Sequence, residues 1–206
     1  MNTKFKNKRR DGLQRQTQIM SIALELFYRK GFITTSIDDI INACSIARGT
    51  FYAHFEGKDA LLNMIIDTNL DMLFESLKVL DISIPEPIDE IKKLYLDVTQ
   101  FLSDMPEIRQ FFTLMLREAN GLNGFIFKKI NSFTNAIITM SAEYIKHGQE
   151  NGRVINDIDP FVTSLCIVGS VKEILFHWLV LGEDIDVKNA ITSTVDLFFR
   201  GMLNPI

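Results

Sequence analysis

Apolar side chains recur at intervals of three and four residues along nearly the whole chain, and no stretch of several residues alternates apolar with polar side chains. The first spacing keeps apolar side chains on one face of a helix, whereas alternation is the pattern of a half-buried strand. Only 5 proline and 11 glycine residues interrupt the pattern, mostly between the apolar runs. We therefore expect an all-α fold. A chain of 206 residues is also long enough to bury a core without disulfides.

Capping residues mark the ends of the first two predicted helices. The first helix ends near residue 30, because two basic residues followed by a glycine are typical of a helix C-terminus. Either Thr35 or Ser36 is suited to cap a short second helix, with Asp38 and Asp39 in its first turn. Later breaks predict helices over 47–54, from 58 to a proline-rich linker at 84–87, and over 87–104, 107–119, 123–150, 160–181 and 186–202.

Charge is distributed unevenly along the chain, whose net charge is -4. The first 60 residues carry ten Lys and Arg against six Asp and Glu, whereas the remainder carries 12 against 20. A basic N-terminal part on an acidic body suits a protein that binds nucleic acid with one end only. The alternative is that a lysine-rich, solvated N-terminal segment inflates the basic count.

The two cysteines, Cys44 and Cys166, are far apart and have no metal-binding spacing. This excludes a disulfide framework or structural zinc site and suits the reducing cytoplasm. The basic N-terminus lacks the apolar segment of a secretory signal. The most apolar stretch, 161–182, contains three ionisable side chains that are costly in lipid, so we expect a buried core helix and no membrane span.

Two short helices joined by a tight turn, after a longer helix, are typical of a helix-turn-helix. In the predicted helix at 47–54, Phe51 faces the core together with the flanking Ile46 and Phe55. Arginine, hydroxyl and aromatic groups suit phosphate oxygens and base edges, and a glycine lets the backbone approach a duplex closely. The residues left to face outward are Arg48, Gly49, Thr50, Tyr52, Ala53 and His54.

The run ARGTFYAHFEGKDAL at 47–61, preceded by Gly31-Phe32 and by TSIDDI at 35–40, resembles the DNA-binding domain of the TetR family of transcriptional regulators. The resemblance covers about residues 12–66 and departs at Ala53, where many relatives have a larger side chain. It implies an N-terminal three-helix helix-turn-helix domain joined by a long helix to an α-helical ligand-binding and dimerisation domain. The expected domains are 1–57, which binds DNA, and 58–206, which holds the connecting helix, the effector site and the dimer surface.

The resemblance also implies roles for the outward-facing side chains. Arg48 is expected to read a guanine edge, because its planar fork donates twice. Thr50 is expected to reach a phosphate or a thymine methyl group, and Tyr52 and His54 to bind phosphates. The alternatives are that Tyr52 only covers the turn and that His54 is an ordinary surface histidine.

Further phosphate contacts are expected at two helix starts. Lys58 begins the long fourth helix, and Thr35 or Ser36 begins the second, so each lies beside free backbone N–H groups. The basic segment 4–10 is either an arm for the minor groove or a solvated tail.

Phenylalanine and methionine are abundant beyond residue 88. Such side chains line adaptable apolar cavities, although any one of them can equally fill a helical core. The resemblance implies a pocket here for a small, largely apolar effector. A pair such as Glu173 and His177 also suits a metal, but no third ligand is evident, so we expect no metal and no cofactor. The predicted effector contacts are Tyr95, Phe111, Met115, Glu118, Tyr144, Glu173, His177 and Trp178.

The last two helices, about 160–181 and 186–202, are expected to form a homodimer. One helix-turn-helix reads too few base pairs to be selective, so a twofold dimer is the physical expectation. Two stripes are predicted to face the partner. They are Phe161, Leu165, Val168, Gly169, Lys172 and Leu175 on the first helix, and Val187, Ala190, Ile191, Thr194, Val195, Phe198 and Met202 on the second.

These features predict a cytoplasmic, dimeric transcriptional repressor that an effector releases from its double-stranded operator, with the long fourth helix transmitting the change. The alternative from another class is an all-helical enzyme or carrier for a hydrophobic small molecule. We see no nucleophile and base pair, no glycine-rich phosphate loop and no catalytic pattern of paired carboxylates, so we expect no enzymatic activity and no catalytic residue.

Overall fold

The computed structural model describes residues 2–77, 87–118 and 124–204. Within these ranges the secondary structure is helical apart from one isolated antiparallel bridge, between Val154 and Leu203, so the all-α prediction is confirmed. Positions 84–86 of the predicted linker lie outside the described residues, and a helix begins at Pro87. The helices are α1 (Asn2–Lys30), α2 (Ile37–Cys44), α3 (Arg48–His54), α4 (Lys58–Leu77), α5 (Pro87–Asp104), α6 (Pro106–Glu118), α7 (Gly124–Glu150), α8 (Pro160–Phe176), its π-helical continuation η1 (His177–Leu181) and α9 (Val187–Met202).

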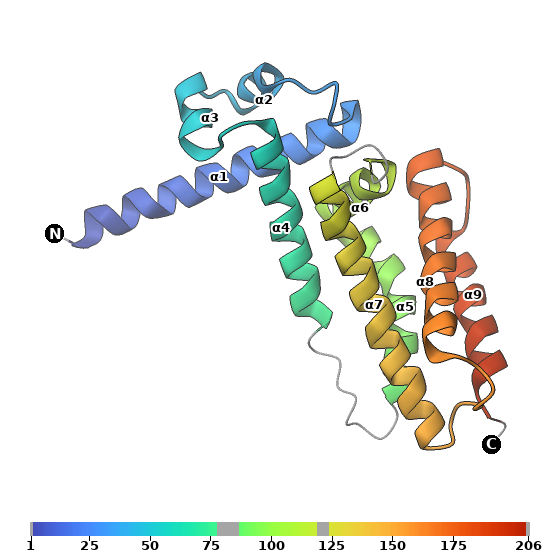
Figure 1. The fold of residues 1–206 in the computed structure, drawn as a ribbon. Helices are drawn as coiled ribbons and strands as arrows, with labels where there is room; N and C mark the ends of the chain where they lie inside the picture. The colour runs from blue at the N-terminus through green and yellow to red at the C-terminus, as the bar shows by residue number, and fades with distance from the viewer. Residues whose placement is uncertain (1, 78–86, 119–123, 205–206) are drawn as a thin grey trace.

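The molecule is elongated, with a small head at one end of a larger helical body (Figure 1). Helices α1, α2 and α3 make up the head, and α4 runs from the head along the body. In the body, α7 packs against α8, α8 against α9, α9 against α5, and α5 against α7. Helix α4 packs against α1 of the head and against α6 and α7 of the body, so the predicted long connecting helix is confirmed.

Local hydrogen bonds and backbone conformation set the turns of the head. α1 ends before Gly31, whose φ of 89° lies in the left-handed region that favours glycine. At the start of α2, the Ser36 hydroxyl accepts from the Asp39 N–H at 3.0 Å, and the Asp39 carboxylate accepts from the Ser36 N–H at 2.9 Å. This capping box fixes where α2 begins. Ser45, with a φ of 52°, reverses the chain between α2 and α3.

Helix α1 begins far earlier than its apolar pattern indicates. The backbone is helical from Asn2, so the basic segment 4–10 continues α1 and is not an extended arm. In Figure 1 this part of α1 projects beyond the rest of the head. Contact between this segment and DNA stays a prediction.

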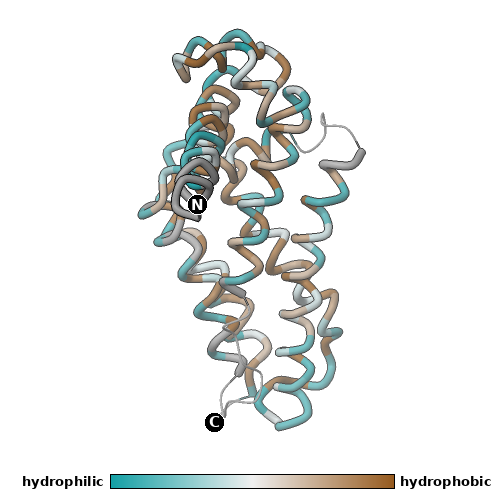
Figure 2. Tube along the Cα trace, turned by 90° about the vertical axis from the view of Figure 1, so that its left-hand side faces the viewer, coloured by the Kyte–Doolittle hydropathy of each residue, from teal (hydrophilic) through white to brown (hydrophobic). Residues whose placement is uncertain are grey.

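The buried side chains form two clusters, and brown and teal segments alternate along the helices in Figure 2, as expected where one face of each helix is buried. The first cluster joins head and body, because Phe27 of α1, Phe51 of α3 and Leu62 of α4 belong to the same cluster as Phe111 of α6 and Phe133 of α7. The second cluster lies among α5 to α9. The core therefore continues across the domain boundary expected after residue 57.

Helix α8 with η1 is buried on one face only. The stretch Pro160–Leu181 is long and apolar enough to cross a membrane by length and composition, and only 22% of its 18-residue apolar window is buried in the structure. Ile167 and Val171 face the core, whereas Phe161 and Leu165 are about half exposed. The expectation of a buried core helix is therefore wrong for the outer face, which is apolar and unpaired within the protomer.

The partner-facing stripe predicted on α9 is wrong at three positions. Ile191, Val195 and Met202 are 0 to 2% exposed within the core of the protomer. A charge at Ile191 would therefore disrupt this core and would not report on a dimer. Leu197 is the apolar side chain that α9 exposes most, at 72%. Helical spacing groups apolar side chains by face, but it does not tell which face meets the same protomer.

Replacing Ile191 by alanine should lower the free energy of unfolding by about 2–5 kcal/mol, because it removes buried methylene groups and leaves a cavity. The matched control is Ile33→Ala, since Ile33 is 76% exposed and the chemical change is identical. The control should change stability by less than about 0.5 kcal/mol. Urea denaturation measures both values, and equal losses would contradict this assignment of faces.

Candidate functional site

Helix α3 separates an anchoring face from an exposed face. Phe51 is fully buried and Phe55 nearly so, and both belong to the core that holds α1, α2 and α4 together. Tyr52 stands edge-on to Phe51, with ring centroids 5.4 Å apart, and is 47% exposed. The remaining predicted residues of α3 are exposed or half-buried, namely Arg48, Gly49, Thr50 and His54. The structure thus presents these predicted contacts together on one short helix.

Arg48 forms an ion pair with Asp38 that links α3 to α2. Both side chains are more than 60% exposed, so water and salt screen the pair and it adds little stability. The guanidinium is therefore oriented toward solvent by a weak contact. A base edge or a phosphate bound by this guanidinium would compete with the Asp38 carboxylate for its N–H donors.

The predicted phosphate contact of Lys58 needs correction. Its ammonium group donates to the carbonyl oxygens of Phe32 at 2.8 Å, Ile33 at 3.2 Å and Thr35 at 2.8 Å. It also lies 4.5 Å from the centre of the Phe32 ring. An ammonium has three N–H groups, and all three are used. Lys58 therefore clamps the turn between α1 and α2 and has no donor left for a phosphate.

Of the two residues predicted at the start of α2, only Ser36 is accessible. Thr35 is fully buried, and its hydroxyl donates to the Gly31 carbonyl at 2.7 Å, so the predicted contact of its side chain with DNA is wrong. Ser36 is exposed and caps α2. The spacing fits a cap at either position, and only the tertiary contacts of the turn distinguish them.

Asp39 completes the cap as an ionised group. The Ser36 backbone N–H lowers the pKa of this carboxyl from 3.8 to about 2, helped by the Ser36 hydroxyl and by the Lys30 ammonium at 3.1 Å. These donors favour the charged form. A negative charge in the first turn also interacts favourably with the helix dipole of α2.

The body contains a cavity of about 610 Å³ between α4, α5, α6, α7 and α8. Its lining is mainly aliphatic and aromatic, with a minority of polar side chains: Asp97, Asn131, Thr134, Lys172 and Glu173. A volume of this size matches pockets for small organic molecules. The cavity is therefore suited to a largely apolar ligand with a few polar groups.

Three of the predicted effector contacts line this cavity: Tyr95, Met115 and Glu173. The Tyr95 hydroxyl lies 2.6 Å from the Ser141 hydroxyl, and burial raises the pKa of Tyr95 to about 12. Tyr95 is therefore a neutral hydrogen-bonding group in the wall. Phenylalanines 112, 127, 133 and 176 also line the cavity, and the abundance of phenylalanine was their only signal in the sequence.

The other predicted contacts do not line the cavity. Phe111 is fully buried in the cluster that joins head and body, and Tyr144 lies in the second cluster. Trp178 packs against the second cluster, with the Arg109 guanidinium 4.6 Å from its ring centre. These aromatic side chains fill the core. They were predicted to line the cavity because core residues and cavity residues have the same helical spacing.

His177 and Glu118, which were predicted to contact an effector, pair with charged side chains of the same chain. His177 lies 2.9 Å from Glu183 and 3.6 Å from Glu173, and the hydrogen bond to Glu183 raises the pKa of the imidazole. In the part of the chain that the structure describes, no three His, Cys, Asp or Glu side chains gather as a metal site. Glu118 pairs with Arg117, at 3.2 Å, beside the end of α1.

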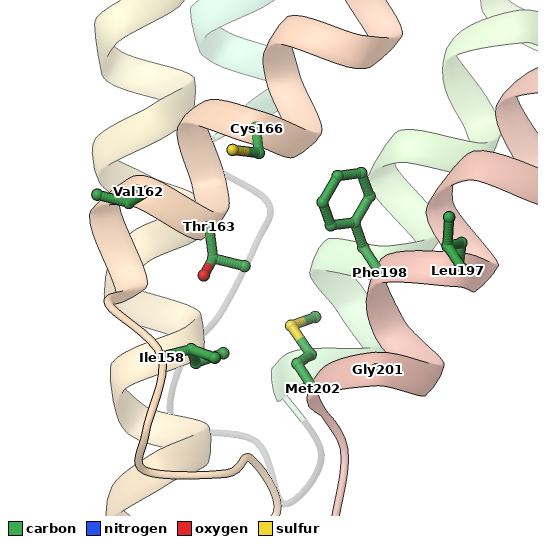
Figure 3. A pocket seen from close by; sticks show the side chains of 8 residues that line it. All are labelled: Ile158, Val162, Thr163, Cys166, Leu197, Phe198, Gly201 and Met202. Atoms are coloured by element: carbon green, nitrogen blue, oxygen red, sulfur yellow. The ribbon is translucent and has the colours of Figure 1, made fainter.

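A shallow apolar groove runs between α8 and α9 on the outer face of the body (Figure 3). Thr163 and Cys166 of α8 lie across it from Phe198 of α9, and Leu197 lies at its edge. Its volume is about 270 Å³. This groove continues the exposed apolar face of α8.

Two family models match the chain. Residues 19–65 match the model described as bacterial regulatory proteins, tetR family, and residues 81–201 match the model described as YsiA-like protein, C-terminal region. The second match covers more than half of the chain. The chain belongs to the TetR family. The family resemblance of the N-terminal part is thereby confirmed. The match over residues 81–201 extends the family assignment to the C-terminal part, where no sequence motif indicated it.

The individual relatives are distant. The uncharacterized HTH-type transcriptional regulator YerO of Bacillus subtilis is 29% identical over 107 residues, which are 51% of this chain and 36% of that protein, so the match spans about a third of this relative. The fatty acid metabolism regulator protein of B. subtilis is 20% identical over 187 residues, or 91% of this chain and 95% of that protein.

Solved structures share the fold over almost the full length. One is the triclosan complex of SmeT, the repressor of the Stenotrophomonas maltophilia multidrug efflux pump SmeDEF, with a TM-score of 0.80 and 18% identity over 93% of this chain and 92% of that chain. The TetR-family architecture of a helix-turn-helix head on a helical body is therefore that of this protein.

The capping box predicts a defined pH dependence. The folded pKa of Asp39 is below its ordinary value, so ionised Asp39 stabilises the fold fully above pH 3.8, and the contribution is lost as pH falls toward about 2. The stability difference between wild type and Asp39→Asn should therefore be constant above about pH 5 and shrink below pH 3.8. Ser36→Ala removes the hydroxyl but keeps the backbone N–H that lowers the pKa of Asp39 most, so its stability difference from wild type should depend less on pH in this range. Unfolding free energies measured from pH 6 downward test this, and a difference that widens with acid would contradict it.

Proposed function

We propose that this TetR-family protein is a dimeric, sequence-specific transcriptional repressor, located in the cytoplasm, that a small and largely apolar effector releases from its operator. The observation that carries the proposal is the pairing of an exposed helix α3, anchored by Phe51, with a cavity of about 610 Å³ in the body. Residues 1–57 would then contact DNA, and residues 58–206 would bind effector and partner. The protein is a binding protein and not an enzyme in this proposal.

The proposed DNA interface is the exposed side of α2 and α3. A helix of this length fits the major groove, where arginine can read guanine and hydroxyl groups can bind phosphates. Positive charge concentrates in the first 60 residues, which favours approach to DNA with the head first. The proposed contacts are Ser36, Arg48, Gly49, Thr50, Tyr52 and His54.

The proposed dimer uses the outer face of α8 and α9. Phe161, Val162, Leu165 and Leu197 are 48 to 72% exposed, and the first three follow one another on α8. Exposed apolar side chains concentrated on one face are typical of a protein interface. A second copy related by a twofold axis would cover the groove in Figure 3 and place two α3 helices for two half-sites.

The proposed effector site is the cavity of the body. Met115 and the neighbouring phenylalanines offer apolar contacts, while Tyr95, Asn131 and Thr134 offer hydrogen bonds. SmeT, which shares the fold, is known as a complex with triclosan, and this supports an organic effector of similar size range.

Selection from a random duplex library should enrich a palindromic operator. Arg48→Ala should then weaken operator binding by about 1–3 kcal/mol and relax the preference at one base position in each half-site. The charge control is Lys93→Ala, which removes one exposed cation from α5 in the body. Titration of labelled duplexes measures the affinities. Equal losses for Arg48→Ala and Lys93→Ala, or no enriched sequence, would contradict the proposed interface.

Leu197→Glu should convert the dimer into a monomer, because it places unpaired carboxylates in an apolar interface. Ile33→Glu is the control, since it adds the same charge at a side chain that is 76% exposed on the head. Sedimentation velocity should show a dimer for wild type and for Ile33→Glu. A dimeric Leu197→Glu variant would place the interface elsewhere.

A further inference from the structure

Arg117, in the last turn of α6, reaches from the body to the end of α1. Its Nη1 donates to the Tyr28 carbonyl at 2.8 Å, and its Nη2 donates to the Phe27 carbonyl at 2.6 Å. Its Nε donates to the Glu118 carboxylate at 3.2 Å. The planar guanidinium therefore binds two backbone oxygens of another helix at once, a geometry that lysine cannot reproduce.

The two acceptors belong to the last turn of α1. The last turn of α1 carries partial negative charge, and a cation there stabilises it. Phe27 O also accepts the Gly31 N–H at 2.9 Å, so the same oxygen takes part in the end of α1 and in the contact with α6. The side chains of Arg117 and Glu118 are 31% and 14% exposed, which limits screening by water. This contact is therefore stronger than an ordinary surface ion pair.

One end of this contact is adjacent to the cavity. Met115 and Leu116, the two residues before Arg117, line the cavity, and Phe112 lines it one turn earlier. A helix is stiff over this length, so a ligand that displaces the wall formed by Met115 and Leu116 also displaces Arg117.

The other end leads directly to the helix-turn-helix. Beyond Gly31, the turn at 32–35 is held by Lys58 and delivers the chain to the Ser36 cap of α2. Glu118 approaches the same turn, since its carboxylate lies 3.6 Å from the position of a Cβ at Gly31. A shift at the end of α1 is therefore a shift at the start of α2.

We propose that Arg117 is the positioning residue that couples occupancy of the cavity to the helix-turn-helix. With the cavity empty, its fork holds the end of α1; with the cavity filled, α6 moves and the fork leaves the Phe27 and Tyr28 carbonyls. The inference rests on the function proposed above. It differs from transmission by α4 alone, which also has one residue, Leu73, in the cavity wall.

The experiment uses the full chain and the neutral fluorescent probe N-phenyl-1-naphthylamine as cavity ligand. The test variant is Arg117→Gln, and Arg117→Lys is a second variant that retains charge and solubility but not the fork. The matched control is Glu118→Gln, which removes the neighbouring charge and leaves both carbonyl contacts of Arg117 in place. Amide hydrogen exchange of Gly31, whose N–H bonds to Phe27 O, reports on the end of α1.

In wild type and Glu118→Gln, saturating probe should speed exchange at Gly31 by about tenfold, because the last turn loses its cation. In Arg117→Gln, exchange should already be fast without the probe, and the probe should add less than about a twofold change. Arg117→Lys should fall between these values. The affinity for the probe itself should stay within about twofold of wild type, since Arg117 is outside the cavity. An equal response of Gly31 in wild type and Arg117→Gln, or none in wild type, would overturn the proposal.

The selected operator separates this inference from the proposed function. In wild type, operator and probe should weaken each other's binding by the same factor, within about 5- to 150-fold, and Arg117→Gln should bring the factor close to one. If no operator is selected, the proposed function fails while the exchange data still decide the role of Arg117. Retained coupling in Arg117→Gln would assign transmission to α4.

Discussion

The ammonium of Lys58 is the interaction on which the geometry of the head depends. The turn between α1 and α2 leaves carbonyl groups that no helix can satisfy, and Lys58 binds three of them from the first turn of α4. One charge thereby ties the end of α1, the start of α2 and the connecting helix to one point. The turn that precedes α2 and α3 is therefore held directly by the first turn of α4.

Sequence reasoning reproduced the features that are set by neighbouring residues. The ends of the first helices follow from Gly31, from the Ser36–Asp39 capping box and from the anchoring Phe51, each of which acts within one or two turns. The all-α fold was predicted from the same kind of local pattern, whereas the family of the head was predicted from the resemblance of about residues 12–66 to the TetR family. The carbonyl oxygens that Lys58 and Arg117 bind lie 23 to 90 residues away along the chain, so local patterns contained no sign of these contacts.

The lining of the cavity in the body and the outer face of α9 were predicted less well, also for a physical reason. Helical periodicity identifies which side chains avoid water, but a core, a cavity and a partner subunit all accept the same side chains. Phe111 and Phe112 are adjacent, yet the first is core and the second lines the cavity. Ile191 and Leu197 belong to one helix, yet one is buried and the other is largely exposed. Only the packing of several helices makes these distinctions.

The contact between Arg48 and Asp38 has a consequence for the salt dependence of DNA binding. A cation that already has a carboxylate partner gains less from a phosphate, and the freed Asp38 stays near the duplex as a like charge. Fewer counterions are then released per complex than the number of basic side chains on the head would indicate. On random DNA, where the base edges do not match the side chains of the head, Arg48 would exchange Asp38 for a phosphate only. At a site with matching base edges, hydrogen bonds to the bases compensate for the lost contact between Arg48 and Asp38. Discrimination between sequences would therefore persist at ionic strengths that abolish purely electrostatic binding.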